Sequence, residues 1–374
     1  MQHCTVDQAH QRQSASAILI DVRDPHETIA GYPAGASLMP LAELGRLILE
    51  DSPDQDRQLL LICQTGNRSQ TAVQQLRKLG FKHLCNVLGG YQAWQEAHLP
   101  VRLPAGFDQQ STERYARHLV IPEVGPEGQL KLLQGRVLLA GAGGLGSPAA
   151  LYLAAAGVGT LGLADDDVVE RSNLQRQILH SESGIGSAKV QSGHKRLQDL
   201  NPSIRLRSHE LRLDAGNIDA ILPDYDIVLD GSDNLPTRYL LNDACIKHGK
   251  PLVYGAVYRF QGQVAVFWPG RKDQPGPCYR CLFPEPPPPE SAPSCAAAGV
   301  LGILPGVIGS LQAVEVLKLL LGIGEPLIGR VLIYDGLQSR FKEVRLRPDP
   351  ECALCRPGAE FPGYIEYQAF CGDA

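Results

Sequence analysis

The sequence has no excess of positive charge. Its 374 residues include 35 Lys and Arg against 40 Asp and Glu, which gives a formal net charge of −5 with the histidines neutral. Proteins that bind nucleic acid over a broad surface are usually strongly basic. The composition therefore argues against a nucleic-acid partner.

The sequence also lacks a secretory signal and an uninterrupted membrane span. Residues 1–4 have neither the basic start nor the apolar core of a signal peptide. The one long apolar stretch, residues 300–324, is interrupted at Pro305, Gln312, Glu315 and Lys318. A buried helix explains such a stretch better than a membrane span does. These absences predict a cytoplasmic protein without a membrane partner.

The cysteine spacing of a small secreted disulfide scaffold is missing too, although ten cysteines are present. The cysteines include two Cys-x-x-Cys pairs and one cysteine in a loop that also contains glycine and arginine. These arrangements indicate metal and sulfur chemistry instead.

Two α/β segments are predicted. Within residues 1–103, apolar runs at 18–22 and 59–63 predict buried strands, and the spacing of residues 69–79 predicts a helix. Residues 104–111 contain proline and glycine and are interpreted as a linker.

Residues 112–347 alternate strand-like and helix-like runs, which predicts a Rossmann-like, doubly wound and mainly parallel sheet. Strands are expected at 137–140, 161–164, 226–229, 263–268 and 331–334. A proline-rich irregular loop is expected at 284–293, and a short irregular tail at 348–374. In such sheets, ligands bind at the carboxyl ends of the strands.

A glycine-rich turn, Gly141–Gly146, follows the 137–140 strand. Its backbone N–H groups and the next helix N-terminus form a phosphate-binding arrangement. Asp165, at the end of the next strand, is suited to accept hydrogen bonds from ribose hydroxyls. This pattern alone fits a nicotinamide or flavin enzyme as well as an ATP-using enzyme.

Three charged residues favour ATP. Arg176 and Lys189 supply cations for a polyphosphate, and Asp233 follows a strand and could hold Mg²⁺ that neutralises the leaving pyrophosphate. Each residue has an ordinary alternative, because the cations could be surface charges and Asp233 a helix cap. Because all three residues occur together with the glycine-rich turn, an ATP site explains them better than three unrelated surface or capping roles.

From Glu113 to Cys355 the sequence resembles the ubiquitin-activating-like adenylyltransferases, specifically the bacterial molybdopterin-synthase adenylyltransferase and its thiamin-pathway relative. The matching segments are Arg114–Arg117, Gly141–Gly146, Ser172–Gln177, Gly186–Val190, Asp233-Asn234, Gly255–Gln263 and the two Cys-x-x-Cys pairs. The resemblance implies that ATP adenylates the C-terminal glycine of a small ubiquitin-fold sulfur-carrier protein, releasing pyrophosphate.

The same resemblance implies roles for individual residues. Arg117 would reach into the site of a partner subunit, which implies a homodimer. Asp233 would bind magnesium, and Arg176 and Lys189 would stabilise charge at the α-phosphorus. The implied ATP-binding set is Gly144, Asp165, Ser172, Asn173, Leu174, Gln175, Arg176, Lys189, Asp233, Asn234 and Arg117.

The two Cys-x-x-Cys pairs have the spacing of zinc ligands. The pairs are Cys278 with Cys281 and Cys352 with Cys355. Each spacing lets two thiolates face one tetrahedral ion. A redox dithiol or ordinary buried thiols are the alternatives. Two pairs, together with the resemblance, predict a closed structural zinc site that takes no part in catalysis.

Cys63 begins a loop, residues 63–69, that lies between a predicted strand and a predicted helix. Loop N–H groups, the helix N-terminus and Arg68 could lower the pKa of Cys63, so that the thiolate holds sulfur as a persulfide. A buried structural cysteine and a phosphatase loop are the alternatives. Phosphatase loops usually place five residues between Cys and Arg, and here there are four.

With Cys63, the segments Asp21–Arg23 and Gly89–Trp94 resemble a single-domain rhodanese across most of residues 15–101. One departure is residues 31–36, which replace a common turn sequence. The resemblance implies that residues 1–103 form a sulfurtransferase domain. It also implies that a cysteine desulfurase supplies the sulfur.

Cys295, after the proline-rich loop, aligns by motif with a cysteine of the adenylyltransferase family that forms a thioester with the carrier or resolves a persulfide linkage. The full expectation is carrier adenylation followed by sulfur transfer from Cys63, most plausibly for molybdenum cofactor biosynthesis. Thiamin or another sulfur-metabolite pathway is the alternative. An NAD(P)-dependent oxidoreductase and a non-catalytic carrier-binding scaffold are alternatives of different classes.

Overall fold

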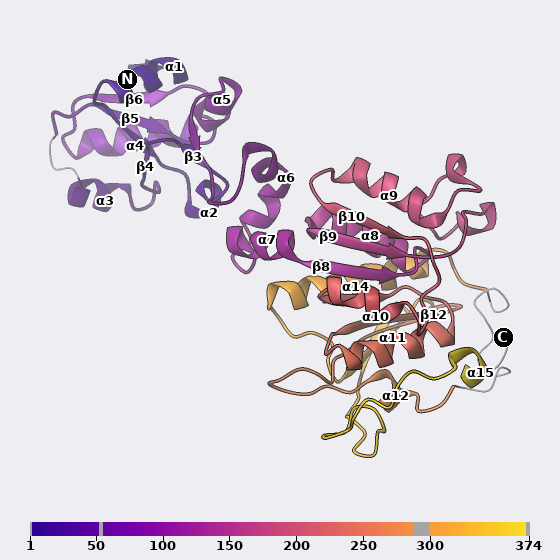
Figure 1. The fold of residues 1–374 in the computed structure, drawn as a ribbon. Coiled ribbons are helices and arrows are strands. Elements are labelled where there is room, and N and C mark those ends of the chain that lie inside the picture. Colours follow the sequence, from indigo (N-terminus) through magenta and orange to yellow (C-terminus); the bar gives the residue numbers. More distant parts are fainter. Residues whose placement is uncertain (1, 52–54, 287–298, 372–374) are drawn as a thin grey trace. The chain divides into compact units, whose positions relative to one another are not determined.

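The computed structural model describes residues 2–51, 55–286 and 299–371. The chain divides into two compact units, residues 1–130 and 131–374, coloured from indigo to magenta and from magenta to yellow in Figure 1. Each unit is built around its own sheet.

The N-terminal unit contains a five-stranded parallel sheet in the order β1-β6-β5-β2-β4. The strands are β1 (Gln2–Cys4), β2 (Ile18–Asp21), β4 (Ser37–Leu38), β5 (Leu59–Ile62) and β6 (Leu84–Val87). All four residues of β5 are buried and apolar, as a strand covered on both faces requires. A separate antiparallel pair joins β3 (Tyr32–Pro33) to β7 (Val101–Arg102).

Helices cover both faces of this sheet. The helices α3 (Leu44–Asp51) and α4 (Asn67–Lys78) pack on one face, and α1 (Val6–Ser14) and α5 (Gly90–Glu96) pack on the other. The remaining helices are α2 (Pro25–Thr28), α6 (Gln109–Leu119) and α7 (Gly125–Gln134), which runs into the second unit. Asp108 caps α6 by accepting a hydrogen bond from the Ser111 backbone N–H at 2.8 Å, so residues 109–111 are helical.

The C-terminal unit contains an eight-stranded sheet in the order β10-β9-β8-β11-β12-β13-β14-β15. The first five strands in this order, from β10 through β9, β8 and β11 to β12, are parallel to their neighbours. Each of the last three strands, β13, β14 and β15, is antiparallel to the strand before it. The bounds are β8 (Arg136–Ala140), β9 (Thr160–Ala164), β10 (Arg205–His209), β11 (Ile227–Asp230), β12 (Leu252–Tyr258), β13 (Gln261–Phe267), β14 (Arg330–Asp335) and β15 (Arg340–Arg345). The predicted α/β class with a mainly parallel sheet is confirmed.

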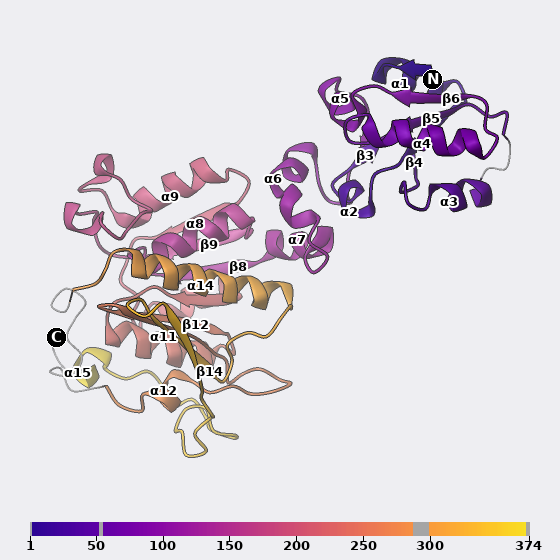
Figure 2. The ribbon, with the colours of Figure 1, turned by 180° about the vertical axis from the view of Figure 1, so that it is seen from behind.

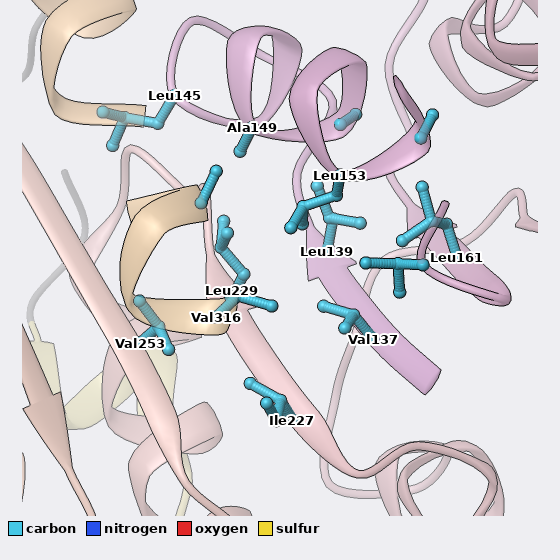
Figure 3. Close-up of a cluster of buried hydrophobic side chains, with 14 of the residues drawn as sticks. Val137, Leu139, Leu145, Ala149, Leu153, Leu161, Ile227, Leu229, Val253 and Val316 are labelled. Carbon is cyan, nitrogen blue, oxygen red and sulfur yellow. The ribbon is translucent and has the colours of Figure 1, made fainter. Parts of the chain in front are cut away.

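The core of this unit lies between the sheet and its helices. On one face, α8 (Gly146–Ala156), α9 (Lys189–Leu200) and α14 (Ile303–Leu321) cover β8, β9 and β11, as Figures 1 and 2 show from opposite sides. Leu139, Leu153, Leu229 and Val316 meet there (Figure 3). On the other face lie α10 (Ile218–Ile221) and α11 (Leu235–Lys247).

Helix α14 is the predicted apolar helix of residues 300–324. Within the described residues it is the one helix long and apolar enough to cross a membrane by length and composition. Its polar residues instead form hydrogen bonds with the backbone of neighbouring segments. The Gln312 side-chain amide donates to the carbonyls of Asp230 and Val253, and the Glu315 carboxylate accepts from the Leu327 backbone N–H. These contacts fit a core helix.

The tail was expected to be irregular, and this expectation is wrong in part. Its end forms α15 (Tyr367–Cys371), which packs against α11. The Tyr367 hydroxyl donates to Asp243 at 2.8 Å, and the Tyr364 hydroxyl donates to Asp219 at 2.5 Å. Aromatic side chains with polar tips thus give a short segment enough buried contact to order it.

Candidate active sites

The glycine-rich turn joins β8 to α8 by a close approach of backbone to backbone. Gly141 has φ +102°, and a Cβ atom on Gly146 would lie 2.0 Å from the Gly141 carbonyl oxygen. Both positions therefore require glycine. The turn is held to β9 because the Ala142 N–H donates to the Asp165 carboxylate at 2.8 Å.

A cavity of about 240 Å³ opens beside this turn, at the carboxyl ends of the parallel strands. Six predicted site residues line it, and they are Gly144, Asp165, Arg176, Lys189, Asp233 and Asn234. The predicted residues Ser172 to Gln175 are not among its lining. They precede Arg176, in and just after the short helix η1 (Arg171–Asn173), and the Arg176 guanidinium donates to the Ser172 carbonyl at 3.2 Å.

Lys189 is paired with acidic side chains in the cavity. Lys189 Nζ lies 2.7 Å from the Asp167 carboxylate and 3.9 Å from the Asp165 carboxylate. Burial raises the pKa of Asp165, although Lys189 and the Ala142 N–H oppose that rise. Asp233 lies just before α11 but does not cap it. Asn234 is the cap, because its side-chain oxygen accepts from the Thr237 N–H at 3.0 Å.

Sequence reasoning missed Arg238 and Asp230. Arg238 lines the cavity and lies 3.4 Å from Asp230, whose side chain is buried and whose pKa is raised by that burial. Arg238 also donates to the carbonyls of Ser232 and Gly255. Its position five residues after Asp233, on the next helix, was the available signal. The ion pair between Arg238 and Asp230 could not be predicted from the sequence.

No role was predicted for His180 from the sequence either. Its Nε2 lies 2.9 Å from the carbonyl oxygen of Ala142 in the glycine-rich turn, and its Nδ1 lies 3.0 Å from the Ser192 hydroxyl. Burial lowers the pKa of His180, which favours the neutral ring. The ring therefore supports the turn rather than supplying charge to the cavity.

The Cys63 loop lies between β5 and α4, as predicted. The Gly66 N–H donates to Cys63 Sγ at 3.1 Å, and the Ser69 hydroxyl lies 3.4 Å from the same sulfur. Burial raises the pKa of Cys63, but hydrogen bonds from Ser69, Thr65 and Gly66 outweigh it, so the net shift is downward. This loop stabilises a thiolate.

Arg68 was expected to help lower the pKa of Cys63, but its guanidinium is directed mainly elsewhere. It makes two hydrogen bonds of 2.6 Å to Glu27, which lies 41 residues earlier in the chain. The hydrogen bonds that lower the pKa of Cys63 come from the loop N–H groups and the Ser69 hydroxyl. The charge of the Cys63 thiolate also helps to raise the pKa of Arg68, and this attraction favours the thiolate, although the guanidinium is hydrogen-bonded to Glu27.

The other two rhodanese segments pack around the loop. Arg23 forms a buried ion pair with Asp21 at 2.6 Å and stacks on the ring of Tyr91 at 3.9 Å. The Tyr91 N–H donates to the Cys63 carbonyl at 2.8 Å. The segments Asp21–Arg23 and Gly89–Trp94 thus fix the loop that carries the thiol.

The four cysteines of the Cys-x-x-Cys pairs come together. Sγ–Sγ distances are 3.8 Å for Cys278 to Cys281, 3.7 Å for Cys278 to Cys352 and 3.3 Å for Cys281 to Cys355. A tetrahedral zinc ion with Zn–S bonds of about 2.3 Å separates its sulfurs by about 3.8 Å. The group can hold one metal ion, and its all-thiolate donor set suits zinc.

Comparison with known proteins decides the family. Residues 115–354 match the ThiF family, and residues 5–97 match the rhodanese-like domain. The chain belongs to the ThiF family. The family predicted from the sequence, an adenylyltransferase joined to a rhodanese domain, is confirmed.

Several relatives of this ThiF-family chain are similar along most of their length. The sulfur carrier protein adenylyltransferase of Thermus thermophilus is 51% identical over 71% of this chain and 98% of its own. The SAMP-activating enzyme E1 of Haloferax volcanii is 51% identical over 67% and 91%. The probable adenylyltransferase/sulfurtransferase MoeZ of Mycobacterium tuberculosis is 47% identical over 73% and 68%. The predicted enzyme class agrees with these names.

A solved structure shares the fold. The crystal structure of MccB from E. coli, with a variant of MccA, superposes with a TM-score of 0.58 at 21% identity, over 71% of this chain and 80% of that one. At this identity the likeness concerns the ThiF fold alone.

The roles predicted for all the site residues of this ThiF-family chain stay predictions, including those of Cys295 and Arg117. Cys295 lies outside the described residues. Arg117 lies on α6 in the N-terminal unit, whereas the cavity belongs to the C-terminal unit. Cys371, to which the sequence assigned no role, lies on α15.

The lowered pKa of Cys63 predicts a pH profile. Because the thiolate is the nucleophile, alkylation of Cys63 by iodoacetamide should reach half its maximal rate at a lower pH than an ordinary thiol. Ser69→Ala removes the hydroxyl donor and should move the midpoint to higher pH. Peptide mass spectrometry at a series of pH values measures both. Cys245, whose pKa burial raises, is the internal control and should stay unmodified. An unchanged midpoint in Ser69→Ala would contradict the assignment.

Proposed function

We propose that this chain uses ATP to adenylate the C-terminal glycine of a small ubiquitin-fold sulfur-carrier protein, and that a persulfide on Cys63 then delivers sulfur to the activated carboxyl. The product is the carrier thiocarboxylate. One observation carries the proposal, namely that a cation-bearing cavity beside the glycine-rich turn and a thiolate-stabilising rhodanese loop occur in one ThiF-family chain. Relatives named adenylyltransferase and sulfurtransferase support it.

In the first step a carrier carboxylate oxygen attacks the α-phosphorus of ATP, the bond to the β-phosphate breaks, and pyrophosphate leaves. The Gly144 segment would hold the phosphates through backbone N–H groups, and Asp165 would accept from the ribose hydroxyls. Lys189, released from Asp167, and Arg176 would stabilise the charge that develops on the phosphates. Residues 172–175 and Asn234 would shape the same site.

Magnesium fits Asp233, whose carboxylate lines the cavity at the end of β11. A hard carboxylate oxygen with phosphate oxygens is the donor set that Mg²⁺ prefers, and the ion would neutralise pyrophosphate charge. Arg117 would enter the cavity of a second copy of the chain, so we propose a homodimer. This rests on the family resemblance.

In the second step the terminal sulfur of the Cys63 persulfide attacks the acyl-adenylate carbonyl, and AMP leaves. The resulting acyl disulfide joins the carrier to Cys63. Attack of the Cys295 thiolate on Cys63 Sγ would then release the thiocarboxylate and leave a Cys63–Cys295 disulfide, which a cellular dithiol reduces. A cysteine desulfurase is the proposed source of sulfur for Cys63.

The four-cysteine cluster is the proposed site of a structural zinc ion. All four thiolates would be occupied as ligands, so no position remains for substrate. The ion would tie residues 278–281 to residues 352–355 and would take no part in either chemical step. We place the enzyme in the cytoplasm and, first among pathways, in molybdenum cofactor biosynthesis, with thiamin synthesis as the alternative.

The test mixes full-length enzyme, ATP, a sulfur-loaded desulfurase and a panel of purified carriers, and then reads carrier masses. The true partner should exchange one oxygen for sulfur. Cys63→Ala should keep carrier-dependent ATP–pyrophosphate exchange and lose thiocarboxylate formation, whereas Cys371→Ala should keep both. Loss of exchange in Cys63→Ala would contradict the division of labour. Saturable nicotinamide binding without exchange would favour an oxidoreductase instead, and carrier binding without adenylate would favour a scaffold.

A further inference from the structure

The loop that carries Cys63 contains one basic residue, and acidic side chains from a distant segment hold it. The Arg68 guanidinium makes two hydrogen bonds of 2.6 Å to the Glu27 carboxylate and lies 3.5 Å from the Asp24 carboxylate. The hydrogen bond from Arg68 holds the pKa of Glu27 below its usual range, so this carboxylate is charged at neutral pH. A bidentate pair of this kind offsets most of the positive charge of the guanidinium. Residues 63–69 therefore offer little net positive charge to an approaching anion.

Helix α2, which contains Glu27, is held beside the loop by a second arginine. Arg23 Nη1 donates to the Gln64 side-chain oxygen at 3.3 Å and to the Glu27 backbone carbonyl at 3.5 Å. Gln64 directly follows Cys63 in the sequence. The charge of Arg23 is itself offset by Asp21, in a buried ion pair of 2.6 Å. Arg23 thus places Glu27 next to the Cys63 loop without adding an uncompensated positive charge there.

The pair of Glu27 and Arg68 lies where an approaching sulfur donor would meet it. Cys63 is 1% exposed, whereas the side chains of Arg68 and Glu27 are 36% and 21% exposed. The charge of the Cys63 thiolate helps to raise the pKa of Arg68, so the two groups are close enough to interact. Charges near a protein surface act over about 8 Å at physiological salt. A donor that brings its sulfur to Cys63 therefore brings its other charges within the field of the pair.

We propose, on the basis of the sulfurtransferase function proposed above for Cys63, that Glu27 is a specificity-determining residue that makes thiosulfate a poor sulfur donor for this site. Thiosulfate carries two negative charges, which an uncompensated Arg68 would attract. Glu27 offsets that attraction. A persulfide on the cysteine of another protein carries at most one negative charge on its sulfur chain, so the same pair discriminates against it less.

The disfavoured reaction is a simple sulfur transfer. The Cys63 thiolate attacks the outer sulfur of thiosulfate, a new sulfur–sulfur bond forms, and the sulfur–sulfur bond of thiosulfate breaks with its electron pair leaving on sulfite. The product is the Cys63 persulfide. Cyanide then attacks the terminal sulfur and leaves as thiocyanate, which restores the Cys63 thiolate.

The experiment measures thiocyanate formation from thiosulfate and cyanide by the full-length protein. Glu27→Gln removes the charge but keeps an oxygen for the Asp24 N–H, which donates to Glu27 at 3.0 Å. This variant should lower the KM for thiosulfate about fivefold, the scale of one partly exposed charge pair, with a smaller change in kcat. Glu43→Gln is the matched control, because Glu43 makes an exposed ion pair with Arg46 in the same domain. Its KM should equal that of wild type.

Further measurements separate a charge effect from a structural one. The difference in KM between Glu27→Gln and wild type should shrink as salt is added, because screening weakens the attraction of the dianion. The midpoint pH for alkylation of Cys63 should fall in Glu27→Gln, because Arg68 then stabilises the thiolate more strongly. Asp24→Asn should lower the KM by a smaller factor, since Asp24 is the more distant partner of Arg68.

A sulfur-loaded cysteine desulfurase provides the comparison with a protein persulfide. Mass spectrometry of the Cys63 peptide should show sulfur loading from it in wild type, and Glu27→Gln should change this loading less than it changes the KM for thiosulfate. An unchanged or higher KM in Glu27→Gln, or an equal fall in Glu43→Gln, would overturn the role of Glu27 and leave the proposed function intact. Absence of sulfur on Cys63 with either donor would contradict the proposed sulfurtransferase function as well.

Discussion

Replacing Gly146 with alanine is expected to lower ATP–pyrophosphate exchange by at least about 100-fold, the loss that a shift of about 1 Å in a catalytic arrangement produces. The added Cβ would lie 2.0 Å from the Gly141 carbonyl oxygen, a distance that no rotamer change relieves. The turn must open, and the first N–H groups of α8 would move away from the proposed phosphate position. The same movement would strain the hydrogen bond from the Ala142 N–H to Asp165, the proposed ribose-binding residue.

Gly306→Ala is the matched control. It adds the same methyl group to the first turns of α14, where the nearest atom, Ile303 Cδ1, is 3.8 Å away. Exchange should therefore stay close to wild type. Circular dichroism and thermal unfolding separate loss of the site from loss of the fold in both variants. A Gly146→Ala enzyme with near-normal exchange would contradict the role given to the turn.

Removing one ligand of the four-cysteine cluster is expected to release zinc and to destabilise the C-terminal unit by several kcal/mol, because binding of a structural zinc ion in small zinc domains contributes on the order of 10 kcal/mol. Cys352→Ser tests this. The cluster joins two segments that lie 74 residues apart. Between the first two cysteines, Arg280 forms an ion pair of 2.8 Å with Asp243 of α11, so the effect should reach that helix.

Zinc content of freshly purified protein, measured by atomic absorption, should be one ion per chain in wild type and near zero in Cys352→Ser. The midpoint of thermal unfolding should fall in that variant, and a chelator should produce a similar fall in wild type. Cys371→Ser, which changes a cysteine outside the cluster, should keep both metal and midpoint. Freshly purified wild-type protein that contains no zinc would contradict the assignment of the cluster as a zinc site.

Much of both candidate sites was predictable because their determinants are local. The Gly141–Gly146 turn, the loop from Cys63 and each Cys-x-x-Cys spacing specify a backbone path within a few residues. The strands before and after them are continuous apolar runs, which parallel strands covered on both faces require. The tail was misjudged because its order depends on Tyr367 meeting Asp243, a partner 124 residues away.

The electrostatic partners were not predictable for the same reason. Arg68 was predicted to act on Cys63 and does attract its thiolate, but no sequence feature showed that its bidentate partner would be Glu27. Lys189 was assigned to phosphate, and the fold also gives it Asp167, 22 residues before it. The position of Arg238 soon after Asp233 was a weak signal, but nothing in the sequence indicated its ion pair with Asp230. A charged side chain reaches several ångströms from its backbone, so its partner is chosen by tertiary packing.

The sequence by itself determined the family, the two α/β segments, the glycine-rich turn, the Cys63 loop and the two Cys-x-x-Cys pairs. These features depend on glycine conformation, apolar periodicity and short ligand spacings, which are properties of a continuous stretch of chain. Only the tertiary structure decided how Lys189 and Arg238 pair with acidic residues in the cavity and which hydrogen bonds lower the pKa of Cys63. Those depend on contacts between strands and helices distant in sequence, which the fold alone brings together.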